Sequence, residues 1–291
     1  MTPGPTQVAE NVRLARSMEC TNPDLDVDFV EFYKETCEEI SRLLHTKNET
    51  LILGGEGILG LEAACASMTE PGDKILVLDN GIYGRGFADF VSMYGGKPEL
   101  YSRDYRETLN VSELEEYLKE HHDYKYATVV HGDTPSGMLN DVAAICPLLK
   151  KYGIMTVVDS VSASFGEPLR IDDCQIDIMC GGSQKVVSAP PGLTFVVISD
   201  DAKKAMKERK IPIASFYANL TTFAHYYEEK WFPYTMPISD IYGLRAAMDN
   251  IAADPDILTR HQQIAEASRK AITSAGLNLY LKSGISSTVT V

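Results

Sequence analysis

Two polar residues at the ends of predicted strands are suited to share one chemical task. Asp159 follows the apolar run Met155–Val158, and Lys185 closes the stretch GGSQK twenty-six residues further on. Taken singly, such an Asp is more often a helix cap and such a Lys a surface residue. Together they match the needs of pyridoxal phosphate, which requires a lysine amine for a Schiff base and an acid that keeps the pyridine nitrogen protonated.

A glycine-rich turn is the second candidate site. Gly55–Gly60 spells GEGILG between a predicted strand and a predicted helix, and Asp79 follows nineteen residues after Gly60. Such a turn lets the backbone approach a phosphate, and its spacing also fits a dinucleotide fingerprint, so an NAD-dependent dehydrogenase is an alternative. An ordinary structural turn is a third interpretation. Glu56 argues against a bound phosphate, because a carboxylate repels it unless the side chain points away.

The elements that must position these residues alternate between strands and helices. Apolar runs bounded by Gly, Pro, Asn or Asp predict strands at Thr50–Gly55, Lys74–Gly81, Tyr126–Asp133, Met155–Val161, Ile176–Ser183 and Leu193–Ser199. Helical patterns occupy Val27–His45, Leu61–Met68, Val111–His122, Val142–Gly153, Ala202–Lys210, Ile241–Ala253 and Leu258–Ala275. Nearly continuous apolar strands with short connections predict an α/β fold whose sheet is covered on both faces. Leu277–Ser283 and Ser287–Val291 are also expected to be strands.

Composition narrows the function classes. The 291 residues include 27 Lys and Arg against 41 Asp and Glu, a formal net charge of −14, which disfavours nucleic acids and anionic lipids as partners. No run approaches the roughly 20 apolar residues that cross a bilayer, and the start lacks an apolar signal segment, so a cytoplasmic protein is expected. The six cysteines have no metal-ligand spacing and are expected to be reduced, with no metal site.

Several stretches together resemble the class V, fold type I pyridoxal-phosphate aminotransferases, in particular the alanine–glyoxylate and serine–pyruvate group. After an N-terminal PGP segment the chain carries, in that family's order, GEGILGLEAA, DNGIYGRGFADF, HGDTPSG, VVDSVSASFG, GGSQK and PYTMPISDIYGLRAA. The resemblance implies a mostly parallel central sheet flanked by helices. It also implies ping-pong transfer of an amino group from alanine or serine to glyoxylate or pyruvate, with pyridoxal 5'-phosphate as cofactor.

The resemblance implies a role for each matching residue. Lys185 would form the Schiff base and shuttle the substrate proton, while Asp159 would pair with the ring nitrogen. Further residues would surround the cofactor: Tyr83 stacked on the ring, Thr134 near its phenolic oxygen, the backbone N–H groups of Glu56 and Gly57 and the side chain of Gln184 at the phosphate, and Thr235 at the phosphate of a neighbouring subunit. The role of Thr235 implies a homodimer with shared active sites.

The chain also departs from the family pattern. Glu56 replaces a serine of the glycine turn and Phe232 replaces an aromatic hydroxyl, so the phosphate cup has fewer hydroxyl donors. The family's arginine for the substrate carboxylate belongs to a later C-terminal domain. Neither Arg85 nor Arg245 matches its position, and Arg245 is expected to pair along a helix face.

These departures set the expected domain organisation. It comprises an N-terminal arm at 1–20, a cofactor-binding large domain at 21–250 and the start of an incomplete small domain at 251–291, with exposed apolar surface near Leu277–Val291. A truncated, catalytically impaired cofactor-binding protein is therefore an alternative to an active enzyme.

Overall fold

The core of the molecule is a seven-stranded sheet. The computed structural model of the protein describes residues 3–289. The strand order is β1 (Glu49–Gly54), β9 (Leu193–Ile198), β8 (Ile178–Gly182), β7 (Met155–Asp159), β4 (Tyr126–Val130), β2 (Lys74–Asp79) and β3 (Lys97–Ser102). Only β9 runs antiparallel to its neighbours among these strands; the pairs from β8 to β3 are all parallel. The expected mostly parallel α/β fold is confirmed.

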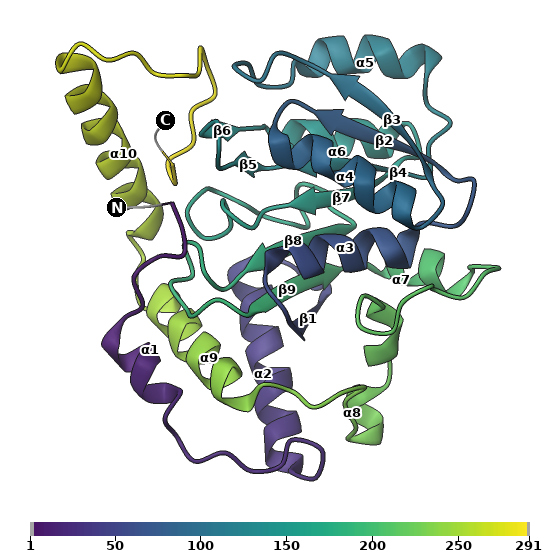
Figure 1. The fold of residues 1–291 in the computed structure, drawn as a ribbon, viewed down its shortest axis with the longest axis vertical. Helices are drawn as coiled ribbons and strands as arrows, with labels where there is room; N and C mark the ends of the chain where they lie inside the picture. Colours follow the sequence, from purple (N-terminus) through teal and green to yellow (C-terminus); the bar gives the residue numbers. More distant parts are fainter. Residues whose placement is uncertain (1–2, 290–291) are drawn as a thin grey trace.

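Helices cover both faces of this sheet. On one face α3 (Gly57–Met68) packs on β8 and β9, and α4 (Ile82–Met93) packs on β2, β3 and β4; the two helices touch each other (Figure 1). The return connections carry α5 (Val111–Glu120) and α6 (Val142–Lys151), which touch each other and which right-handed crossovers place on the opposite face. This double cover explains why β4, β8 and β9 are buried along their whole lengths.

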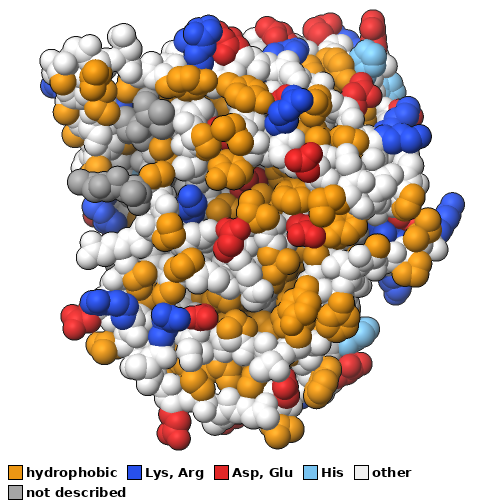
Figure 2. All heavy atoms as spheres, in the orientation of Figure 1, with side chains coloured by type: hydrophobic (Ala, Val, Ile, Leu, Met, Phe, Trp, Pro, Cys, Tyr) orange, Lys and Arg blue, Asp and Glu red, His pale blue; other side chains and the backbone are white. Residues whose placement is uncertain are grey.

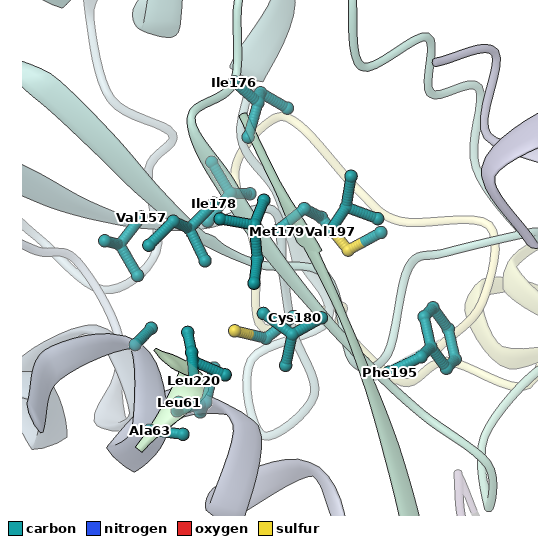
Figure 3. Packing of buried hydrophobic residues seen from close by; sticks show 14 of the residues in the cluster. Leu61, Ala63, Val157, Ile176, Ile178, Met179, Cys180, Phe195, Val197 and Leu220 are labelled. Atoms are coloured by element: carbon teal, nitrogen blue, oxygen red, sulfur yellow. The ribbon is translucent and has the colours of Figure 1, made fainter. Parts of the chain in front are cut away.

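The core under α3 is closely packed. Leu61 and Ala63 of α3 face the side of the sheet that carries Cys180 of β8 (Figure 3). A side chain at Gly60 would meet Thr194 of β9, so the glycine lets the helix approach the sheet. All six cysteines are free, as predicted, and only Cys20 is exposed.

The helix α2 (Val27–Leu43) protects the edge of the sheet at β1. The Tyr33 hydroxyl accepts a hydrogen bond from the Ile52 amide across 2.8 Å and donates one to the Ile52 carbonyl across 2.9 Å. These bonds use the outward backbone groups of an edge strand, which are otherwise open to pairing with another chain.

The remaining elements lie outside the seven-stranded sheet. Their bounds are α1 (Glu10–Ala15), β5 (Gly132–Asp133), β6 (Met138–Leu139), α7 (Asp200–Lys207), the 3-10 helix η1 (Leu220–Phe223), α8 (Tyr226–Glu229), α9 (Ile238–Ala252) and α10 (Ile257–Ser274). The helix α1 packs on α9, which also contacts α2. No helix within residues 3–289 is long and apolar enough to cross a membrane.

No strand forms in the described part of the two segments that were predicted to be strands after α10. Leu277–Ser283 is irregular with bends, and residues 287–289 form no strand; Thr290 and Val291 lie outside the described residues. A strand needs a neighbour for its backbone groups, and here a single bridge joins Ile285 to Met138. The expected exposure holds for Leu277 and Tyr280, whereas Leu281 is buried.

Candidate active site

A cavity opens where β7 and β8 end and α3 begins. Of the eight residues predicted to form the site, seven line it: Glu56, Gly57, Tyr83, Thr134, Asp159, Gln184 and Lys185. The carboxyl ends of parallel strands meet at one edge of a sheet, which is why segments far apart in the sequence converge here. Thr235 lies outside the cavity, where its hydroxyl donates to Asp24 Oδ2 across 3.4 Å.

Asp159 is the last residue of β7 and is 5% exposed. Its Oδ1 accepts a hydrogen bond from the Val161 amide across 2.9 Å. Burial raises the pKa of Asp159 to about 7; the Val161 hydrogen bond and Lys185 oppose this rise, while the carboxylates of Asp133 and Glu56 add to it. A carboxyl group in this setting is ready to ionise when a cationic partner comes against it.

Lys185 lies in the loop after β8, and the N-terminal arm holds that loop in place. The Thr6 amide donates to the Gln184 carbonyl across 3.0 Å, and the Thr6 hydroxyl donates to the Lys185 carbonyl across 2.7 Å. A Cβ atom built on Gly4 would lie 2.7 Å from Lys185 Cδ and 3.0 Å from Nζ. The family resemblance included the PGP segment only as a motif. The spacing of residues could not reveal that this segment contacts the lysine.

Tyr83 lies in the first turn of α4, at the mouth of the cavity, with 38% of its surface exposed. Its turn is supported by Asp133, a buried residue that the sequence analysis did not single out. Asp133 Oδ2 accepts from the Ser136 hydroxyl across 2.6 Å, and a Cβ atom on Gly81 would lie 2.6 Å from the Asp133 carboxyl carbon. Asp133 therefore fixes how closely the chain before Tyr83 approaches the cavity floor.

His131 is a structural neighbour of the site. Its Nδ1 lies 3.0 Å from the Ser160 hydroxyl oxygen, and its amide donates to the Asp159 carbonyl across 2.8 Å. Burial lowers the pKa of His131 to about 4, so the ring is neutral near pH 7. Among the described residues, His131 is outside the set that lines the cavity.

The carboxylate of Glu56, in the glycine turn, already accepts two hydrogen bonds. Glu56 caps α3: its Oε1 accepts from the Ile58 amide across 3.2 Å, and its Oε2 accepts from Gln184 Nε2 across 3.0 Å. We call the part of the cavity that holds Lys185, Asp159 and Tyr83 the ring end. Its amine, buried acid and aromatic face fit a pyridoxal ring. The predicted phosphate end fits less well, because a carboxylate holds both the helix N–H and the glutamine amide.

The dinucleotide alternative is not supported. Asp79 is 1% exposed, and its carboxylate is held by Arg85 Nη1 at 3.1 Å, the Ser102 hydroxyl at 2.7 Å and the Tyr105 hydroxyl at 2.7 Å. A carboxylate so occupied is not free for a ribose hydroxyl. Arg245 pairs with Asp249 one helical turn away, as expected.

Within the described part of the chain, His, Cys, Asp and Glu side chains form no group of three that could hold a metal ion. The polar side chains that line the cavity include an amine, two carboxylates and hydroxyls.

The fold is that of fold type I aminotransferases. A structure of the ureidoglycine–glyoxylate aminotransferase from Bacillus subtilis superposes with a TM-score of 0.95 at 25% identity, over 100% of this chain and 76% of that one. The pyridoxamine–pyruvate transaminase of Mesorhizobium japonicum is 34% identical over 89% of this chain and 67% of its own length. The mouse alanine–glyoxylate aminotransferase is 29% identical over 96% of this chain and 69% of its own.

The sequence also matches a family profile over nearly its whole length. Residues 9–284 match Aminotransferase class-V. The chain belongs to the class V aminotransferase family, a family of transaminases.

Proposed function

We propose that the protein transfers an amino group from a small amino acid, alanine or serine, to a 2-oxo acid, glyoxylate or pyruvate. The observation that carries this proposal is the placement of Asp159 and Lys185 on one cavity at the ends of adjacent parallel strands. The names of the relatives support the substrate pair, since alanine, glyoxylate and pyruvate all occur in them.

A pyridoxal ring, when bound, carries the amino group between the two acids and withdraws electrons from the substrate Cα. In this proposal Lys185 Nζ takes the Cα proton and returns it to the ring side of the substrate, as a general base and acid. The Asp159 carboxylate would hold the proton of the ring nitrogen. Tyr83 would keep the ring plane fixed by stacking, and the Thr134 hydroxyl would orient the ring.

A homodimer with shared sites is part of the proposal. Apolar side chains gather over the middle of the face on which α3 and α4 lie (Figure 2). Ile82, beside Tyr83 in α4, is 62% exposed, and Ile58, which lines the cavity, is 38% exposed. Such a patch beside a site favours contact with a second copy, whose Thr235 would complete the cavity.

A second candidate for the amino donor is pyridoxamine, the donor in the name of the Mesorhizobium relative. The engaged carboxylate of Glu56 favours it, because a ring without a phosphate has no anion to bring against that carboxylate.

The proposed role of Lys185 is tested by Lys185→Ala, with Lys207→Ala, an exposed lysine on α7, as the control. We expect amino transfer from alanine or pyridoxamine to fall by roughly 1,000-fold or more in the first variant, since general base catalysis contributes about 100- to 10,000-fold. The control should match the parent. Retained transfer in Lys185→Ala would remove the lysine from its role.

A further inference from the structure

The end of the cavity near α3 carries acceptors where a phosphate needs donors. A phosphate at a helix start is bound by free backbone N–H groups and by cationic side chains. At the start of α3, the Ile58 amide instead donates a hydrogen bond to the Glu56 carboxylate across 3.2 Å. Lys185 is the sole cation among the described residues that line the cavity, and its amine is assigned to the reacting end.

Gln184 adds a second acceptor at the same end. Its Nε2 donates to Glu56 Oε2 across 3.0 Å. Exchanging the nitrogen and oxygen of this side-chain amide would place the oxygen against a carboxylate, so the orientation is fixed. That orientation leaves Gln184 Oε1 buried and, within the described residues, without a hydrogen-bond donor. The side chain is 6% exposed, so bulk water has little access to the unpaired oxygen. A buried acceptor of this kind calls for a donor from a ligand.

The first turn of α3 also has no free space at Gly57, because Val161 packs against it. A Cβ atom on Gly57 would lie 2.7 Å and 2.8 Å from the two methyl groups of Val161, so an apolar side chain already packs against this turn. A phosphate placed here would exchange its water shell for a methyl surface and a carboxylate, and neither replaces the lost hydrogen bonds.

We infer that Glu56 and Gln184 select a pyridoxal or pyridoxamine ring that carries a free hydroxymethyl group in place of the phosphate ester. This inference rests on the proposed function for the ring end of the cavity, with pyridoxamine, the second candidate, as the amino donor. A hydroxyl donates to one acceptor and remains neutral, which matches the Glu56 carboxylate and the Gln184 amide oxygen. A phosphate dianion offers acceptors alone and is repelled by the carboxylate.

The consequence is that the ring itself exchanges as a substrate. Without a phosphate the ring loses its strongest anchor and leaves after each half-reaction. The balanced reaction is then pyridoxamine plus a 2-oxo acid giving pyridoxal plus an amino acid, with the amino group exchanged for the carbonyl oxygen and no other reactant consumed. Glu56 and Gln184 are the specificity-determining residues of this reaction.

The test compares the dissociation constants of pyridoxal and pyridoxal 5'-phosphate by equilibrium dialysis of the full chain. We expect the parent protein to bind pyridoxal at least tenfold more tightly than the phosphate ester. Glu56→Ser should reverse the preference, because it removes the charge and leaves the helix N–H groups free. Glu62→Gln, on the same helix, removes one carboxylate charge away from the cavity and should keep the parent preference.

The outcomes separate this inference from the proposed function. Tighter binding of the phosphate ester by the parent, or an unchanged ratio in Glu56→Ser, overturns the inference while the ring site stands. Failure of both compounds to bind overturns the ring site and the inference together.

Discussion

The hydroxyl of Thr6 donates a hydrogen bond to the carbonyl of Lys185 across 2.7 Å, which ties the N-terminal arm to the loop of the reactive lysine over 179 positions of sequence. The arm also brings Gly4 against the lysine side chain. The position of the Lys185 amine therefore depends on a segment outside the sheet that supports the rest of the cavity.

Thr6→Val tests this positioning role. The variant keeps the shape of the side chain and loses its hydrogen bond, a change of about 1 kcal/mol. We expect kcat to fall about fivefold, the KM for the 2-oxo acid to stay within twofold, and Thr6→Ser to restore the parent rate. Equal loss in Thr6→Val and Thr6→Ser, or a change confined to thermal stability, would show that the hydroxyl does not position the lysine.

The raised pKa of Asp159 predicts how the free energy of unfolding depends on pH when no ring is bound. Burial raises the pKa of its folded-state carboxyl to about 7, above the unfolded value of about 3.9. The folded state then holds the extra proton between these values, so the free energy of unfolding falls as the pH rises from about 4 to about 7 and levels off above. The slope is at most about 1.4 kcal/mol per pH unit.

Urea unfolding of the ring-free protein at pH 5 and pH 8 measures this effect. Asp159→Asn removes the titrating group, so the variant should gain stability relative to the parent at pH 8 compared with pH 5. A difference between parent and variant that does not change with pH would contradict the raised pKa.

We expect Gly57→Ala to lower the stability of the protein by crowding the first turn of α3. Its new methyl group would lie within 2.8 Å of both Val161 methyls, and overpacking of this kind costs about 1 to 3 kcal/mol. Gly86→Ala is the matched control, because that helical glycine has no atom within 4 Å of its added Cβ and should gain about 0.5 to 1 kcal/mol. Chemical denaturation of both variants gives the comparison; two changes of the same sign would contradict the packing described.

Much of the fold follows from the sequence because buried strands are apolar along their length. The runs at Tyr126–Val130 and Leu193–Ile198 fall inside the predicted strands. The edge strand Lys97–Ser102 was missed, since it is mostly exposed and reads KPELYS. The strand predicted at Leu277–Ser283 was wrong, because an apolar pattern does not supply the neighbour that a strand requires.

The candidate site was predictable where single residues carry the chemistry. Asp159 and Lys185 were identified from their types and from strand ends, and both line the cavity. The bond between Glu56 and Gln184 joins loops 128 positions apart, and it depends on side-chain direction, which neither spacing nor motif encodes. The assignment of both residues to a phosphate remains a prediction that the dialysis comparison tests.

The most direct test of the account is to identify the lysine that captures the ring. The protein is incubated with pyridoxal, and separately with pyridoxal 5'-phosphate, reduced with borohydride, digested and analysed by mass spectrometry. The account predicts that the peptide containing Lys185 carries the added mass, and that this labelling falls when pyridoxamine alone is present in excess, because the amine competes for the cavity and cannot form a Schiff base with the lysine. Labelling spread over surface lysines such as Lys207, with Lys185 unmodified, would contradict it.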